Sequence, residues 1–411
     1  MDICSVLTDK FLRYVKVDTQ SSETSGKSPS TEKQKDLGRM LTEELRDMGA
    51  DEVYFDDEHC YVYAKIHASD GRKDGKKLAF ISHMDTSPEV TDENVNPRIV
   101  KNYDGKDIDL GGDGKYILST EKFPALKNYV GQTLITTDGS TLLGADDKAG
   151  VSEIMTMAEY LITHPEEKHG EIRICFTPDE EIGEGVDHID LDKLDADYAY
   201  TVDGGAFGEI EYENFNAAGV RVIIKGVSVH PGDAKNTMVN ASLVAIELND
   251  LLPKNQRPDN TEGYQGFYHL TEMKGTVDEA EISYIIRDHD MSKFLEKKAL
   301  MSKICDVLNQ KYGEGTCELQ MRDQYYNMKE KIEPENIFLI EKAKKHMREL
   351  GQEPIIKPIR GGTDGARLSF MGLPCPNLCT GGHNYHGRFE YACVESMEKT
   401  AKLLIAIAKD F

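Results

Sequence analysis

Apolar runs and alternating apolar and polar positions predict buried strands in the first half of the chain. Lys77–Ser82 is a short apolar run that ends at His83. Glu171–Thr177 has an apolar residue at every second position, and Asp197–Val202 stops at Asp203. Runs of this length, bounded by turn-forming residues, are typical of strands.

Apolar positions with a period near 3.6 residues predict helices between and around these strands. The predicted helices are Ile3–Val15, Glu32–Met48, Ala149–His164, Ile337–Leu350 and Val394–Ala408. Strands that alternate with amphipathic helices indicate an α/β fold, with a mostly parallel sheet flanked by helices on both faces.

The pattern changes after about Ala217, where strands and helices follow the order β-α-β-β-α-β. The predicted elements are strand Val220–Gly226, helix Asn240–Leu252, strands Gly266–Gly275 and Glu279–Asp288, helix Met291–Tyr312 and strand Thr316–Tyr325. This order is typical of a ferredoxin-like α+β domain. We therefore predict one domain in two segments, 1–213 and 327–411, with a second domain inserted at 214–326.

Composition excludes several classes of protein. The 411 residues include 73 acidic and 49 basic ones, which gives a formal net charge of −24 and disfavours nucleic acid as a partner. The longest aliphatic stretch, Leu403–Ala408, is far too short to span a membrane. Met1–Lys10 does not resemble a signal peptide, and the eight scattered cysteines favour a reducing compartment, so we expect a cytoplasmic protein.

Polar residues gather where the predicted strands end. His83 and Asp85 follow the first strand, Glu180-Glu181 the second, and Asp203 the third. The ligand crevice of an α/β sheet lies at the carboxyl ends of its strands, so these residues are candidate metal ligands. Asp146-Asp147, just before a helix, would by itself be an ordinary cap, and each of the other pairs by itself an ordinary surface feature.

A second candidate metal site is the cluster Cys375, Cys379, His383 and His386. Its spacing is not the paired CxxC of structural zinc sites, so we favour it less.

Five motifs, in this order along the chain, resemble the M20 family of dinuclear zinc peptidases. They are His83-Met84-Asp85-Thr86, Leu143–Gly150, Pro178–Gly183, Val202–Gly205 and His383-Asn384-Tyr385-His386-Gly387. The resemblance runs from about Lys10 to the C-terminus and includes the predicted insertion.

The resemblance implies a role for each motif residue. Asp146 would bridge two Zn²⁺ ions per subunit, with His83 and Asp203 at one ion and Glu181 and His386 at the other. Glu180 would be the base that activates a metal-bridging water, Asp85 would orient His83, and the Asp146–Asp147 peptide would be cis. Co²⁺ or Mn²⁺ would also suit such ligands.

The resemblance also implies substrate contacts from the inserted domain. His230 and Asn240 match positions that contact substrate, and Arg287 and Arg360 match arginines that bind the peptide carboxylate. Taken singly, Asn240 would only cap its helix, and each arginine would only form a surface salt bridge.

The implied activity is release of the N-terminal residue from short peptides, most of all tripeptides. The alternatives are another M20 amide hydrolase, such as a dipeptidase or an N-acyl amino acid deacylase, and a peptide-binding protein without activity. An intact Glu180 argues against the last. The resemblance also implies that segments 1–213 and 327–411 form the catalytic domain. The insertion at 214–326 would be a lid or dimerisation domain, through which a homodimer forms.

Overall fold

The computed structural model describes residues 1–69, 71–72 and 75–411, which divide into two units. Unit 1 contains Met1–Tyr212, Glu330–Lys357 and Thr363–Phe411. Unit 2 contains Glu213–Lys329 and Pro358–Gly362. No helix within the described ranges is long and apolar enough to cross a membrane.

Unit 1 is built on an eight-stranded sheet with the order β1-β2-β8-β3-β9-β16-β10-β15. The strands are β1 (Asp51–Asp56), β2 (Tyr61–Ile66), β3 (Lys77–His83), β8 (Glu171–Thr177), β9 (Tyr198–Gly204), β10 (Glu209–Glu211), β15 (Ile355–Ile356) and β16 (Asn377–Cys379). The four central strands β8, β3, β9 and β16 are parallel, whereas β1 and β2 form an antiparallel edge. The α/β fold with a mostly parallel sheet is therefore confirmed.

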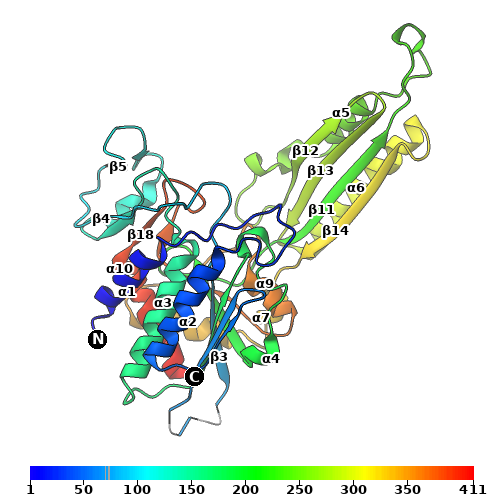
Figure 1. Cartoon of the computed structure of the whole chain (residues 1–411). Helices are drawn as coiled ribbons and strands as arrows, with labels where there is room; N and C mark the ends of the chain where they lie inside the picture. The colour runs from blue at the N-terminus through cyan, green and yellow to red at the C-terminus, as the bar shows by residue number, and fades with distance from the viewer. Residues whose placement is uncertain (70, 73–74) are drawn as a thin grey trace. The chain divides into compact units, whose positions relative to one another are not determined.

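Helices cover both faces of this sheet (Figure 1). They are α1 (Ile3–Tyr14), α2 (Gln34–Met48), α3 (Ala145–Thr163), α4 (Leu191–Leu194), α8 (Phe338–Glu349), α9 (Asp364–Phe370) and α10 (Val394–Asp410), and the short helix α7 (Lys329–Ile332) lies at the return to unit 1. Residues of α2, α3, α8 and α10 share one core with the sheet, and α9 contributes to the core on the opposite face.

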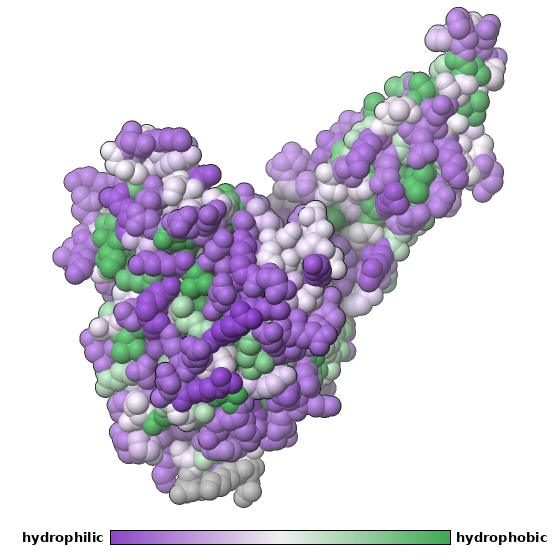
Figure 2. Space-filling model, viewed as in Figure 1, coloured by the Kyte–Doolittle hydropathy of each residue, from purple (hydrophilic) through white to green (hydrophobic). Residues whose placement is uncertain are grey.

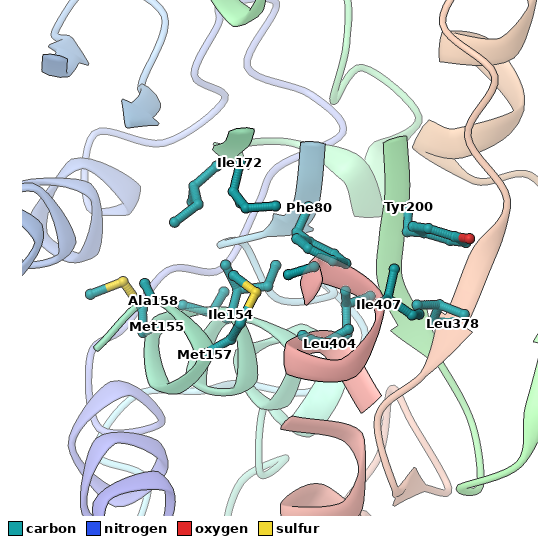
Figure 3. Close-up of a cluster of buried hydrophobic side chains, with 14 of the residues drawn as sticks. Phe80, Ile154, Met155, Met157, Ala158, Ile172, Tyr200, Leu378, Leu404 and Ile407 are labelled. Atoms are coloured by element: carbon teal, nitrogen blue, oxygen red, sulfur yellow. The ribbon is translucent and has the colours of Figure 1, made fainter. Parts of the chain in front are cut away.

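The main core lies between the sheet and the helices α3 and α10. Figure 3 shows Phe80 of β3 and Tyr200 of β9 on one side of it, with Ile154 of α3 and Leu404 of α10 on the other. Along β3, Leu78 and Phe80 enter this core while Ala79 and Ile81 enter the core of the other face. The strand is buried on both faces, which explains its uninterrupted apolar sequence.

Smaller strands flank the main sheet in unit 1. β17 (Gly382–His383), β18 (Tyr391–Cys393), β7 (Leu134–Thr136) and β4 (Arg98–Val100) form a second sheet, and β5 (Ile108–Asp109) pairs with β6 (Ile117–Leu118). Strands of two or three residues are too short to show a period in the sequence, and we did not predict them.

Unit 2 has the ferredoxin-like order that the sequence predicts. Its antiparallel sheet has the order β12-β13-β11-β14, with α5 and α6 packed on one face (Figure 1). The elements are β11 (Asn216–Lys225), α5 (Ala241–Leu251), β12 (Phe267–Gly275), β13 (Glu279–Asp288), α6 (Met291–Tyr312) and β14 (Cys317–Tyr325). Alternate residues of β11 and β13, such as Val222 opposite Ile282, form its core.

Candidate metal centre

The strand order of unit 1 brings the candidate ligands together. β8, β3 and β9 are parallel neighbours, so His83 at the end of β3 lies beside Thr177 at the end of β8. The chain continues from β8 into the short 3-10 helix η2 (Glu180–Ile182), and Asp203 lies at the end of β9. The crevice at the carboxyl ends of the strands therefore holds these predicted residues.

Asp146 lies at the centre of the cluster, with its two oxygens facing different partners. Its Oδ1 is 2.9 Å from Nε2 of His83, and that nitrogen is 3.5 Å from Oδ1 of Asp203. Its Oδ2 is 3.4 Å from Nε2 of His386, which is 3.0 Å from Oε2 of Glu181. A carboxylate in this position is suited to bridge two cations.

Ligand atoms of two residue groups come within 4.8 Å of one another: His83, Glu180 and Asp203, and His83, Asp146 and Glu181. Glu180 therefore lies among the candidate ligands, and distance alone does not distinguish a ligand from a base. Among the described residues, neither group contains a cysteine. Cys375 and Cys379 are buried in the hydrophobic cores, and His383 bonds to Tyr129, so these residues do not form the alternative site.

Asp85 contacts both η2 and the ring of His83. Its carboxylate accepts the backbone N–H groups of Glu180 (3.0 Å) and Glu181 (3.2 Å). Its carbonyl oxygen and its Oδ1 lie 3.0 and 3.3 Å from Nδ1 of His83. The first turn of η2 and the ring of His83 are thus held by one side chain.

Two acidic residues, Glu390 and Asp147, hold the non-helical start of α3 that carries Asp146, and the sequence did not predict this role for either. Glu390 accepts the backbone N–H groups of Leu143 (2.7 Å), Gly144 (2.8 Å) and Asp146 (3.0 Å). Asp147 is fully buried, and the peptide that joins it to Asp146 is cis, which confirms that expectation.

Asp147 in turn accepts hydrogen bonds from the hydroxyl of Ser82 and from the backbone N–H groups of His83 and Gly150. Gly150 allows α3 to approach β9, because a Cβ at this position would lie 1.9 Å from the carbonyl oxygen of Val202. Close packing of the helix on the strand therefore sets the position of the Asp146 loop.

Electrostatics in the cluster are dominated by buried negative charge. Burial, followed by repulsion from neighbouring carboxylates, raises the pKa of Glu180 and raises that of Glu181 to about 8. Burial also raises the pKa of Asp203 to about 6. Hydrogen bonds from His386 and His83 outweigh burial at Asp146 and lower its pKa.

The neighbouring carboxylates raise the pKa values of both histidines as well. Hydrogen bonds to Asp146 and Glu181 raise the pKa of His386 to about 11. Burial opposes the charge on His83, but Asp203, Asp146 and Asp85 together outweigh it and raise its pKa.

The donor set fits divalent cations. Glu181 has an oxygen, Oε1, that is buried without a hydrogen-bond partner, and its side chain is only 4% exposed. Buried carboxylates of this kind need a compensating positive charge, and nitrogen and oxygen donors of histidine and carboxylate suit Zn²⁺. Cations would relieve the same repulsion that raises the carboxyl pKa values.

The remaining predicted residues lie in unit 2, where each has local contacts. His230 is exposed, and its Nδ1 accepts the N–H of Gly232. Asn240 caps α5 by accepting the N–H of Leu243, as the simpler interpretation expects.

The two arginines are more strongly engaged. Nη1 of Arg287, a residue 8% exposed, donates to the carbonyl oxygens of Ala218 and Ile286. Arg360 donates from Nη1 to the carbonyl oxygens of Gly263 and Gln265 and from Nη2 to Thr261. Each guanidinium also lies over an aromatic ring of unit 2.

Comparisons with known proteins find peptidases with the same fold. A family model described as a peptidase dimerisation domain matches residues 212–316. The aminopeptidase PepT of Bacillus cereus shares the fold, with a TM-score of 0.77 at 24% identity over 99% of this chain and 98% of that one. So does YXEP of Bacillus subtilis, described as a dinuclear metal-binding peptidase of the M20 family, with a TM-score of 0.67 at 15% identity over 99% and 98% of the two chains.

Sequence similarity is closer still among curated proteins. Peptidase T of Clostridium perfringens is 57% identical over 401 residues, and the match covers 98% of each chain. The M20 resemblance of the five motifs is therefore confirmed over nearly the whole length, and the chain belongs to the peptidase T family of M20 peptidases.

Proposed function

We propose that this chain is a dinuclear metal aminopeptidase that releases the N-terminal residue of short peptides, with a preference for tripeptides. The observation that carries the proposal is the position of Asp146, whose two oxygens face His83 and Asp203 on one side and Glu181 and His386 on the other. The family membership of the chain supports the same activity.

Two Zn²⁺ ions, or Co²⁺ or Mn²⁺ in their place, would be held by His83, Asp146, Glu181, Asp203 and His386. When bound, such ions lower the pKa of a water molecule and polarise a carbonyl group. Glu180 accepts a proton from the attacking water and delivers it to the leaving amine, which is the role of a general base and then a general acid. Asp85 holds the backbone of Glu180 and the ring of His83 in place for this task.

The residues of unit 2 would recognise the rest of the peptide. His230 and Asn240 contact the substrate, and Arg287 and Arg360 bind its terminal carboxylate. Arg360 already donates four hydrogen bonds within unit 2, two of them to Thr261, so the carboxylate would be bound by Nε or in exchange for one of these contacts.

The chain would act as a homodimer in the cytoplasm. The matched dimerisation domain falls on unit 2, where apolar side chains of α5 are exposed, including Leu243 at 61% and Ile246 at 46%. Apolar surface is visible within unit 2 in Figure 2. All eight cysteines are free and seven of them are buried, which fits a reducing compartment.

The proposed activity is tested with a panel of four substrates and zinc-loaded protein. Trialanine should yield alanine and dialanine, whereas dialanine and N-acetylalanine should be poor substrates. Trialanine amide should be cleaved about 10- to 100-fold less efficiently, because it lacks the carboxylate that the arginines bind. Preferential cleavage of N-acetylalanine would favour a deacylase, and equal cleavage of trialanine and its amide would contradict the role of the arginines.

A further inference from the structure

A carboxylate at the edge of the candidate metal centre has no role in the reaction as proposed so far. Oε1 of Glu89 lies 3.4 Å from Nδ1 of His386, the ring nitrogen that faces away from Glu181 and Asp146. The hydroxyl of Ser87 donates to the other oxygen of Glu89 and fixes the side chain. Glu89 therefore has a defined position beside one candidate ligand.

Glu89 differs from the other carboxylates that support the ligands. Asp85, Asp147 and Glu390 are at most 1% exposed, and each accepts backbone N–H groups. The side chain of Glu89 is 57% exposed and keeps lone pairs that face solvent. Of these four carboxylates, Glu89 is therefore the one that is exposed and accessible to a substrate.

An aminopeptidase needs such a group. The α-amino nitrogen of a peptide is separated from the first carbonyl carbon by a single carbon atom, so its acceptor must lie beside the groups that act on that carbonyl. At pH 7 this amino group, with a pKa of about 7.7–8.0, is mostly protonated and carries three donors. A carboxylate at hydrogen-bond distance is the strongest partner that a protein offers to it.

We propose that Glu89 binds the α-ammonium group of the substrate and thereby restricts the enzyme to peptides with a free N-terminus. This inference rests on the proposed aminopeptidase activity and adds the residue that recognises the N-terminus. The ring of His386 alone separates Glu89 from Asp146 and Glu181, so the ammonium site would lie at the edge of the centre. Glu89 would then be a specificity-determining residue.

The competing explanation is that Glu89 only orients the ring of His386, as carboxylates often do for metal-binding histidines. The two explanations differ in which substrates are affected. An orienting residue acts on every substrate alike and on metal affinity, whereas an ammonium acceptor acts only on substrates that carry the ammonium.

The experiment compares Glu89→Gln with the unmodified chain on trialanine and on propanoyl-dialanine, which has the same scissile amide without the amino group. Glu93→Gln is the matched control, since Glu93 is exposed in the same loop four residues away. Binding of Co²⁺ is followed in each variant through its visible absorption, which reports on the metal site without turnover.

We expect the unmodified chain to prefer trialanine, and Glu89→Gln to lower kcat/KM for trialanine about 10- to 100-fold. The value for propanoyl-dialanine and the affinity for Co²⁺ should stay unchanged, and Glu93→Gln should behave as the unmodified chain. Equal losses on both substrates, or weaker Co²⁺ binding, would overturn the proposal in favour of an orienting role. Failure of the unmodified chain to cleave either peptide would instead refute the aminopeptidase activity itself, and this inference with it.

Discussion

Asp146 and its neighbours show how ordinary residues become a site through their surroundings. An aspartate near the start of a helix is usually a cap, and adjacent glutamates are usually a solvated pair. Here Glu390 and Asp147 fix the loop of Asp146, while Asp85 fixes the backbone of Glu180 and Glu181. The geometry of the centre therefore depends on buried carboxylates that are not themselves proposed ligands.

Adjacent glutamates should differ in what they contribute. Glu180→Gln should keep nearly full metal content and lose about 10²–10⁴-fold in kcat, because it removes only proton transfer. Glu181→Gln should instead lose metal from one of the two positions, because it removes a ligand beside His386. Metal analysis and steady-state kinetics on the same preparations distinguish the two.

The control for this pair is Glu184→Gln, an exposed residue just beyond η2. It should retain both metal and turnover. If Glu180→Gln loses metal as Glu181→Gln does, Glu180 is a ligand and the base must be another group.

Sequence reasoning finds some of these residues and not others. His83, Glu180, Glu181 and Asp203 follow strands that can be recognised by pattern, and the strands of a parallel sheet end at the same edge. No sequence pattern identifies Glu390, because it is 244 residues away from Asp146 and contacts it only in the folded chain. Asp147 could be seen only as part of an acidic pair.

Burial determines which helices and strands the hydrophobic pattern predicts. The predicted range Glu171–Thr177 coincides with β8, and Met291–Tyr312 coincides with α6, because both have long and regular apolar patterns. The edge strand β1 and its neighbour β2 were missed. β1 is exposed or half-buried throughout, and β2 is almost wholly buried, so neither shows a clear alternation.

Helix α3 carries a buried carboxyl group, that of Glu153, which should limit the stability of unit 1 as pH rises. Glu153 is fully buried, and both of its carboxylate oxygens lack a hydrogen-bond partner. Burial, reinforced by Asp147, raises its pKa well above the usual range. The folded chain therefore holds a proton at Glu153 at pH values where the unfolded chain, with a pKa of about 4.3, has released it.

This difference makes folding less favourable as pH rises. The stability linked to Glu153 is complete below the pKa of the unfolded chain and is lost progressively toward the higher pKa of the folded chain. Glu153→Gln removes the group that titrates. As pH rises over that range, the free energy of unfolding of this variant should therefore exceed that of the unmodified chain by an additional amount of up to about 1.4 kcal/mol per pH unit.

Urea unfolding of metal-free protein at several pH values between about 5 and 8 measures this difference in the free energy of unfolding. Proteins are usually most stable in roughly this range of pH. Glu159→Gln is the control, because Glu159 lies on the same helix in an ion pair with Lys10 at 2.9 Å, and a partly exposed pair contributes about 0–1 kcal/mol. A constant difference between Glu153→Gln and the unmodified chain across this range would show that Glu153 does not titrate in this way.

In the whole molecule, the sequence pattern predicts one boundary between the two units but not the segment that returns to unit 2. The change of pattern near Ala217 lies close to Glu213, where unit 2 begins. The return of Pro358–Gly362 to unit 2 has no counterpart in the sequence pattern, because it depends on contacts of Arg360 with Thr261 and Gly263 almost 100 residues away. Short segments of this kind are placed by tertiary contacts alone.

Unit 2 has a surface that should pair two copies of the chain. β12 is an edge strand, and its residues from His269 to Gly275 are exposed, as are Leu243 and Ile246 on the adjacent α5. An unpaired edge beside exposed apolar side chains is typical of an association surface.

We expect light scattering to give about twice the chain mass of 46.1 kDa for the unmodified protein. The double variant Leu243→Lys, Ile246→Lys should be monomeric, whereas Val130→Lys, which changes an equally exposed apolar residue of unit 1, should remain dimeric. A monomer at working concentration in the unmodified protein, with full activity, would exclude any contribution of a second copy to the site.

Anomalous diffraction at the zinc edge, from crystals of zinc-loaded protein, would show directly whether Asp146 bridges two metal ions in unit 1. We expect two peaks about 3.5–4 Å apart, one beside Oδ1 of Asp146 with His83 and Asp203, the other beside Oδ2 with Glu181 and His386. A single peak, or a peak bound by Cys375 and Cys379, would contradict it.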